Sequence, residues 1–199
     1  NNRITSLSEI ERIDGLPVLG IVPSSKYLDD VGLHVIGHPK SMVTEAIRTL
    51  RTNLDFFNVQ GRKKVIAISS TVSGEGKSFI AMNLGGVLAL SKKKVILLDL
   101  DMRKPKNVLD AGPESKSRGI STVLIRKNSW QECLIKTSVE NFDFIPSGPH
   151  PPNPSELLMH SEFEVLLEEL KQQYDYIILD TPPVGLVTDG IMAMKRADI

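Results

Sequence analysis

Cysteine and long apolar runs are both scarce in this sequence. The 199-residue chain contains one cysteine, Cys133, so no disulfide can form within it, and we expect a reducing, cytosolic setting. No stretch approaches the ~20 apolar residues that a membrane-spanning helix needs. The first residues also lack the apolar core of a signal peptide. These absences exclude a disulfide-stabilised secreted domain and a membrane span within this stretch of sequence.

An excess of one charge is also missing. Lys plus Arg and Asp plus Glu number 24 each, which gives a net charge of zero. This balance excludes a globally basic nucleic-acid binder and leaves only a local basic patch open, so we expect no nucleic-acid partner. Zinc is not expected either, because none of the four histidines has a metal-ligand spacing with Cys133.

The domain organisation is expected to be one core domain with a leading segment. Hydrophobic residues make up 41% of the chain, which is enough for a single globular core. We expect residues 1–40 to form a linker with a short edge strand near 16–23 and a loop over 24–40. Residues 41–199 then form the main domain. Because the chain does not begin with Met and stops where a new strand begins, we expect a piece of a longer protein, truncated at its C-terminal side.

Apolar residues recur at helical spacing in some segments and form short buried runs in others. The predicted strands are 65–68, 95–98, 142–146 and 176–179. The predicted helices are 42–57, 77–90, one within 119–125 capped by Ser121, one that starts at Asn153-Pro154, and one over 161–173 that begins with a capping box. Strands that alternate with helices predict an α/β fold with a mostly parallel sheet flanked by helices.

A glycine-rich loop between the first long strand and its helix is the sharpest motif. Residues 70–78 read Ser-Thr-Val-Ser-Gly-Glu-Gly-Lys-Ser. Glycines let backbone N–H groups turn toward phosphate, and the next helix points its positive end at the same place. This variant P-loop has Thr71 where the usual pattern begins with Gly; a chance glycine-rich turn is the alternative. We expect it to bind ATP and Mg²⁺ through Ser73, Gly74, Glu75, Gly76, Lys77, Ser78 and Phe79.

Three carboxylates follow predicted strands: Asp99, Asp101 and Asp180. Ligands of open α/β sheets bind at the carboxyl ends of strands, where such groups can hold Mg²⁺ or accept a proton. The alternative for each one is a simple cap of a turn or helix. Arg103 follows closely and could stabilise a transferring phosphoryl group, or could lie in a solvated basic turn.

A charged repeat lies on the first predicted helix, where Glu45, Arg48 and Arg51 are spaced by three residues. The residues alone favour an intrahelical ladder of ion pairs, each of which stabilises the helix by about 0.3 kcal/mol. A charge contact between subunits is the alternative.

Together these motifs resemble the bacterial tyrosine kinases, or BY-kinases, of capsule and exopolysaccharide assembly. Residues 70–78 resemble their Walker A motif, 96–103 their diagnostic Walker A′ motif, and 177–183 their Walker B motif. Residues 148–158 are also similar to a segment of the family. The family's ring-forming motif is similar to the repeat Glu45-x-x-Arg48-x-x-Arg51, which moves our expectation for this helix to oligomerisation.

The resemblance implies a P-loop NTPase-like fold, related to MinD and ParA, and an ATP-dependent protein-tyrosine autokinase. It implies that Lys77 holds the phosphates and that Ser78 and Asp180 bind Mg²⁺. Asp99 and Asp101 would share metal contact and proton acceptance. Arg103 would stabilise the charge that develops on the phosphoryl group during transfer. The implied partners are a ring of identical subunits, tyrosine-bearing substrates and a transmembrane activator fused upstream, at the cytoplasmic face of the bacterial inner membrane.

The sequence departs from the family at several positions. Ser73 stands where the family often has Pro, 106–108 lacks the internal tyrosine that some members carry, and no tyrosine cluster precedes Ile199. One rival interpretation is a MinD/ParA-type ATPase switch, which would carry a lysine where Val72 stands. The other is a nucleotide-gated interaction module without kinase activity, against which the intact Lys77 and aspartates argue.

Overall fold

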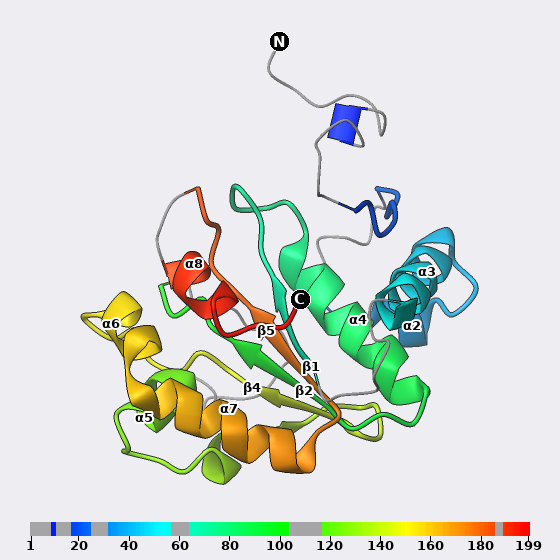
Figure 1. Cartoon of the computed structure of the whole chain (residues 1–199). Coiled ribbons are helices and arrows are strands. Elements are labelled where there is room, and N and C mark those ends of the chain that lie inside the picture. Colours follow the sequence, from blue (N-terminus) through cyan, green and yellow to red (C-terminus); the bar gives the residue numbers. More distant parts are fainter. Residues whose placement is uncertain (1–8, 11–16, 25–31, 57–63, 104–116, 186–188) are drawn as a thin grey trace.

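A five-stranded sheet forms the centre of the computed structural model, which describes residues 9–10, 17–24, 32–56, 64–103, 117–185 and 189–199. The strand order is β1-β5-β2-β4-β3, and only the β3–β4 pair is antiparallel (Figure 1). The strands are β1 (Lys64–Ile68), β2 (Val95–Asp99), β3 (Ile135–Lys136), β4 (Phe142–Ile145) and β5 (Tyr176–Asp180). The predicted α/β fold with a mostly parallel sheet is therefore confirmed.

Helices cover both faces of the sheet (Figure 1). One face shares a hydrophobic core with α2 (His34–Gly37), α3 (Met42–Phe56) and α4 (Lys77–Leu90). The other face packs against α5 (Ile120–Leu124), η2 (Gln131–Cys133), α6 (Pro154–Met159), α7 (Ser161–Gln173) and α8 (Asp189–Met194). None of the described helices is both long and apolar enough to cross a membrane.

Helix α4 is buried on nearly every side, because it lies between the sheet and the α2–α3 layer. Its sequence is apolar all round, as expected for such a helix. The one amide on its buried face, Asn83, accepts the N–H of Val35 at 3.0 Å and donates to the carbonyl of Phe79 at 2.9 Å. The bond to Val35 ties α4 to α2, whereas the bond to Phe79 lies within α4.

The predicted edge strand at 16–23 is wrong for its described part, since residues 17–24 form no strand. Helix α3 holds this segment instead: Asn53 donates its side-chain amide to the Leu19 carbonyl at 2.6 Å, and Gly20 approaches the side chain of Leu50. The loop expected over 24–40 also contains the short helix α2. Pro17 and Pro23, near the two ends of the predicted edge strand, limit the hydrogen bonds that this segment could offer for strand pairing.

Two predicted helix starts are corrected. The N-cap of α5 is Gly119, and Ser121 lies inside the helix, where its hydroxyl donates to the Pro149 carbonyl at 2.7 Å. The capping box at Ser161 does not form, because the N-cap of α7 is His160, whose side chain makes no capping hydrogen bond. His160 is also the C-cap of α6, so α6 and α7 adjoin and the extended linking residue serves both.

The sequence patterns missed β3 and α8, which are two and six residues long. The expected new strand near the end of the chain is partly confirmed. No strand is assigned there, but Asp198 N–H donates to the Val65 carbonyl and Ala67 N–H donates to the Ile199 carbonyl, both at 2.8 Å. These terminal residues therefore extend the hydrogen-bonding pattern of the sheet beside β1.

The contact between α4 and β4 predicts a sharp cost for any side chain at Gly85. A Cβ there would lie 2.4 Å from the ring of Phe142, which is buried. We expect Gly85→Ala to lower the free energy of unfolding by about 1–3 kcal/mol, although Ala favours helix. Urea unfolding measures this value. Gly37→Ala is the control, because a Cβ there meets nothing within 4 Å; equal effects would contradict the argument.

Candidate functional site

The glycine-rich loop has the backbone of a phosphate-binding nest. Gly74 and Gly76 have φ angles of 90° and 87°, a region that other residues rarely adopt, and a Cβ on either would meet nothing within 4 Å. The obstacle to other residues is therefore backbone strain and not lack of space. Alternating backbone conformations of this kind turn successive N–H groups toward one point, where they can bind an anion.

Helix α4 begins directly after the loop, with Gly76 as its N-cap. The first turn contains Lys77, Ser78 and Phe79, all buried. The first backbone N–H groups and the positive end of this 14-residue helix face the loop, which favours a bound phosphate. Because the ring of Phe79 lies in the core 5.7 Å from that of His34, Phe79 can offer only its backbone N–H to a ligand. Ser73 is exposed at the rim.

Lys77 contacts the predicted Walker B carboxylate. Its Nζ lies 3.2 Å from Asp180 Oδ1, and both side chains are buried. This contact is an ion pair without hydrogen-bond geometry, since Asp180 Oδ1 accepts no hydrogen bond in the described part of the chain. A buried charge without a partner is costly, so each group compensates the other. The ammonium is therefore held at the carboxyl end of β5, beside the loop.

The register of the sheet brings two predicted carboxylates side by side. Asp99 at the end of β2 pairs with Asp180 at the end of β5, and adjacent strands lie about 4.8 Å apart. Asp101 is also buried, and its N–H donates to Asp99 Oδ1 at 3.0 Å. The predicted clustering of Lys77, Ser78 and the three aspartates at one edge of the sheet agrees with this geometry.

Hard oxygen ligands at this edge fit Mg²⁺. The hydroxyl of Ser78 and the carboxylates of Asp99 and Asp180 are the donor types that Mg²⁺ prefers, and one or two carboxylates suffice because the ion keeps several waters. In the described ranges no group of three or more His, Cys, Asp or Glu side chains forms a ready metal cage. The donor set suits an ion that arrives with phosphate ligands.

Arg103 is exposed and ends the described stretch that follows β2. The residue before it, Met102, is buried, and its carbonyl lies 2.8 Å from Nδ1 of His150. Sequence reasoning missed His150, because a lone histidine in a proline-rich loop has no distinctive spacing. It connects the 146–153 loop to the turn that carries Asp101 and Arg103.

The charged repeat on α3 makes one of the ion pairs expected from its spacing. Arg48 pairs with Glu45 and also donates to the Pro39 carbonyl at 3.1 Å. Arg51 pairs with Asp55 at 3.5 Å instead of with the repeat itself. All of these side chains are at least a third exposed, so they remain accessible to a second subunit.

The two described tyrosines, Tyr174 and Tyr176, are each 7% exposed. The prediction that Tyr176 packs in the core is confirmed. Neither residue offers an accessible hydroxyl to an active site, and Tyr27 lies outside the described residues.

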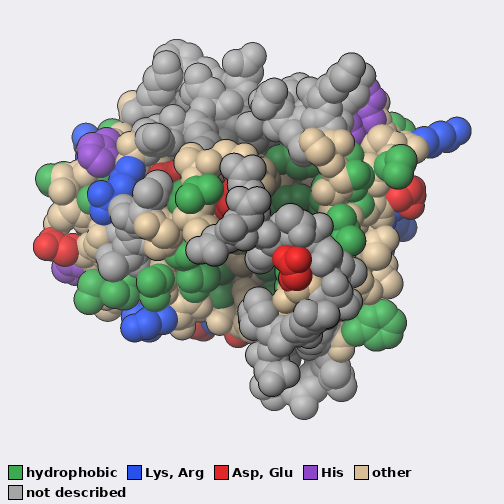
Figure 2. All heavy atoms as spheres, turned by 90° about the horizontal axis from the view of Figure 1, so that it is seen from above, with side chains coloured by type: hydrophobic (Ala, Val, Ile, Leu, Met, Phe, Trp, Pro, Cys, Tyr) green, Lys and Arg blue, Asp and Glu red, His purple; other side chains and the backbone are tan. Residues whose placement is uncertain are grey.

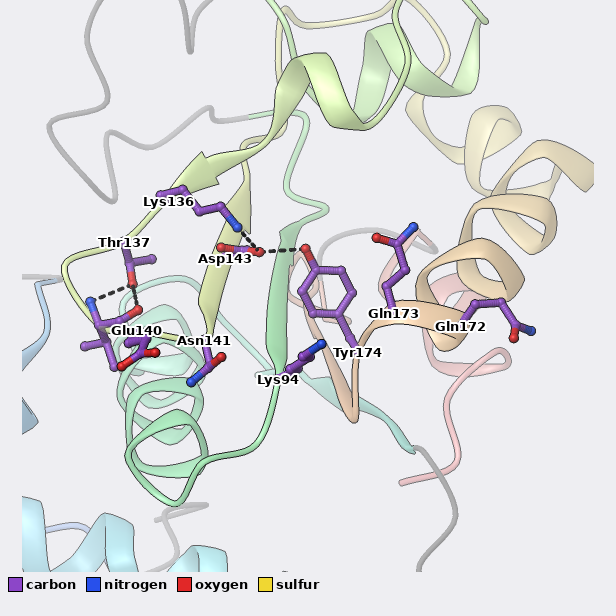
Figure 3. Close-up of a pocket in the computed structure, with 10 residues that line it drawn as sticks. Lys94, Lys136, Thr137, Glu140, Asn141, Asp143, Gln172, Gln173 and Tyr174 are labelled. Carbon is purple, nitrogen blue, oxygen red and sulfur yellow. Dashed lines mark hydrogen bonds and ion pairs between the residues drawn. The ribbon is translucent and has the colours of Figure 1, made fainter.

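A cavity lies at the opposite, amino-terminal edge of the sheet (Figure 3). Its volume is about 710 Å³. Within it, the buried Asp143 accepts hydrogen bonds on one oxygen from Tyr174 at 2.6 Å and from Lys136 at 2.8 Å. Burial, followed by the bond to Asp143, raises the pKa of the Tyr174 phenol. The lining lysines and carboxylates balance in charge, so the cavity favours no ion of one sign.

Figure 2 shows the carboxyl-terminal side of the sheet from above. Acidic, basic and hydrophobic side chains are interspersed over the described part of this face. No broad area of one charge appears among the described side chains of this face.

The fold and the site together define an α/β protein with a P-loop for nucleotide binding. A family model described as an AAA domain matches residues 63–199. The curated relatives narrow the class. CapB of Staphylococcus aureus, a putative tyrosine-protein kinase, is 38% identical over 79% of this chain and 69% of its own length. The tyrosine-protein kinase YwqD of Bacillus subtilis is 40% identical over 80% of this chain and 67% of its own. The chain belongs to the bacterial tyrosine-protein kinase family.

Solved structures agree. The chimerical protein CapA2B2 shares 35% identity and a TM-score of 0.85, covering 96% of this chain and 82% of that one. The kinase domain of the Escherichia coli tyrosine kinase ETK shares 29% identity and a TM-score of 0.88, covering 96% and 78%. The septum site-determining protein MinD of Pyrococcus horikoshii, at 24% identity and a TM-score of 0.56 over 68% of this chain and 55% of its own, shares the fold.

The chain spans only part of some relatives. It covers 23% of the tyrosine-protein kinase wzc of Salmonella typhi, with 40% identity over 82% of this chain. These relatives therefore contain much sequence that has no counterpart in this chain.

The raised pKa of Tyr174 predicts a pH dependence of stability. The unfolded phenol ionises near pH 10.0, whereas the folded protein keeps it protonated to higher pH. This contribution is complete below pH 10 and is lost as pH rises above it. We expect Tyr174→Phe to be less stable near neutral pH but to lose less stability in the alkaline range, measured by urea unfolding. Lys136→Met keeps the phenol and should keep the wild-type alkaline slope; a wild-type slope in Tyr174→Phe would refute this assignment.

Proposed function

We propose that this protein is an ATP-dependent protein-tyrosine kinase that transfers the γ-phosphate of ATP to tyrosine and regulates capsular or exopolysaccharide polymerisation and export. The observation that carries the proposal is the group of buried charges beside the P-loop. Lys77 pairs with Asp180, and Asp99 lies next to Asp180 in register. Membership of the bacterial tyrosine-protein kinase family supports the same reaction.

Each residue has a role that follows from its position. When nucleotide binds, the ammonium of Lys77 would move from Asp180 to the β- and γ-phosphates. Asp180, Asp99 and the Ser78 hydroxyl would hold Mg²⁺, which would supply charge neutralisation at the transferring phosphoryl group. The backbone N–H groups of 73–79 bind the remaining phosphate oxygens.

The acceptor step needs a base and a cation. The tyrosine oxygen forms a bond to the γ-phosphorus while the bond to the bridging β,γ-oxygen breaks and ADP leaves. Asp101, or Asp99 beside it, takes the phenolic proton. Arg103 is exposed next to Asp101 and can approach the transferring group, where it stabilises the developing charge.

The acceptor tyrosine comes from outside the described core, because Tyr174 and Tyr176 are buried. We assign this role to tyrosines of other protein molecules and of a C-terminal tail that would follow Ile199. An exposed α3 with Glu45, Arg48 and Arg51 supports assembly into a homo-oligomeric ring, in which one subunit presents such a tyrosine to its neighbour.

A membrane partner completes the proposal. Relatives such as wzc are more than four times as long as the matched region, because this chain covers 23% of that protein. A transmembrane activator fused upstream would place residues 1–40 between the membrane part and the kinase domain of 41–199. The kinase then works at the cytoplasmic face of the bacterial inner membrane.

Two rival functions remain for the test below. A MinD/ParA-type switch would hydrolyse ATP, but the loop has Val72 where such proteins carry a lysine. A non-catalytic interaction module would bind nucleotide without chemistry, but its site would have no need of the buried Lys77–Asp180 pair and of two further aspartates.

Labelled ATP separates these functions. Incubation of the full-length protein with γ-labelled ATP and Mg²⁺ should give label on tyrosine. Lys77→Met should reduce that label by about 100-fold or more, because an interaction with the transferring phosphate is lost. Lys93→Met, an exposed lysine at the opposite edge of the sheet, is the control and should label like the wild type. Free phosphate without protein label would indicate the switch, and binding without either product would indicate the interaction module.

Assembly is tested separately by sedimentation velocity. Arg48→Ala combined with Arg51→Ala should convert the oligomer to smaller species, because exposed arginines that contact a second subunit are removed. The matched control is Arg126→Ala with Lys171→Ala, which removes two cations that also form surface ion pairs with glutamates. Unchanged sedimentation of the first double variant would rule out the ring contact on α3.

A further inference from the structure

We propose that Glu75 is a positioning residue that holds the P-loop in its phosphate-binding shape from within, without touching the nucleotide through its side chain. This inference rests on the proposed nucleotide-binding function. Glu75 lies at the tip of the loop, between Gly74 and Gly76, whose left-handed backbones reverse the chain on each side of it.

The carboxylate of Glu75 turns back onto the start of the loop. Its Oε2 accepts the backbone N–H of Thr71 at 2.9 Å and that of Val72 at 3.2 Å. The hydroxyl of Ser70 donates to the Val72 carbonyl at 2.8 Å and tightens the same turn. Glu75 therefore holds two backbone groups near the start of the loop, whereas the N–H groups nearest α4 are the ones that would face a phosphate.

The start of the loop is held from a second side by the segment that follows β5. Val184 N–H donates to the Ser70 carbonyl at 2.9 Å, and Gly185 N–H donates to the Thr71 carbonyl at 3.0 Å. Gly185 approaches so closely that a Cβ would lie 2.4 Å from the Thr71 carbonyl oxygen. Thr71 is thus fixed through its N–H by Glu75 and through its carbonyl by Gly185.

This double attachment joins the phosphate loop to the strand that carries Asp180. Asp180 ends β5, only four residues before Val184, and its side chain contacts Lys77. A loop that is already ordered before the nucleotide arrives has a smaller entropic cost of binding. Glu75 accordingly keeps the phosphate-binding loop at a fixed separation from the carboxylate of Asp180, which is a proposed Mg²⁺ ligand.

The charge of Glu75 gives an opposing expectation, which makes the inference testable. A carboxylate that only lies near bound triphosphate would repel it, and its removal would tighten ATP binding. A carboxylate that holds the loop would weaken binding when removed. Glutamine separates charge from hydrogen bonding, because its side-chain oxygen still accepts N–H donors.

The experiment measures the dissociation constant of Mg-ADP and Mg-ATP by calorimetry, with the full-length protein and its variants. We expect Glu75→Ala to raise both constants roughly tenfold, from two lost hydrogen bonds, and Glu75→Gln to stay within about threefold of wild type. Hydrogen exchange of the Thr71 and Val72 amides should be fast in the alanine variant and slow in the glutamine variant. In turnover, the alanine variant should raise KM for ATP more than it lowers kcat.

Glu140→Ala, an exposed glutamate at the opposite edge of the sheet, is the control and should bind like the wild type. Thermal unfolding confirms that each variant is folded. Wild-type or tighter binding by Glu75→Ala, or equal weakening by alanine and glutamine, would overturn the inference. Because binding is read without phosphorylation, loss of the proposed kinase function would appear separately, as a wild-type protein that binds nucleotide and labels no tyrosine.

Discussion

The pairing of β5 with its two neighbours is the constraint on which the site depends. Because β5 lies between β1 and β2, Asp180 comes level with Ile68 on one side and Asp99 on the other. The P-loop begins just after β1 and the A′ aspartates begin at the end of β2. If β5 shifted by one residue relative to its neighbours, the side chain of Asp180 would turn to the other face of the sheet and separate from Lys77.

Much of this arrangement could be predicted from residue patterns alone. Strands such as β2 and β5 are short apolar runs closed by aspartate, and their parallel pairing follows from the helices between them. The loop glycines are equally informative, since a left-handed backbone is what makes glycine necessary there. Local sequence therefore indicated both the fold and the place where the charged groups meet.

The failures have a common physical origin, which is that tertiary contacts decided the outcome. Residues 17–24 had the composition of a strand but found their partner in Asn53 on α3. Ser161 had the composition of a cap, yet α6 ends so close to α7 that His160 takes that position. The contact of Glu75 with Thr71 and the support of Met102 by His150 involve backbone groups, which carry no residue-specific signal in the sequence.

The burial of α4 has a mechanical consequence. Gly85 lies directly against the ring of Phe142, and Asn83 ties the opposite side of the helix to Val35. A helix held on both sides in this way can neither rotate nor slide without breaking contacts in two layers. Any rearrangement during a catalytic cycle must therefore involve side chains and loops at the carboxyl-terminal edge of the sheet, while α4 keeps the distance between that edge and α3 constant.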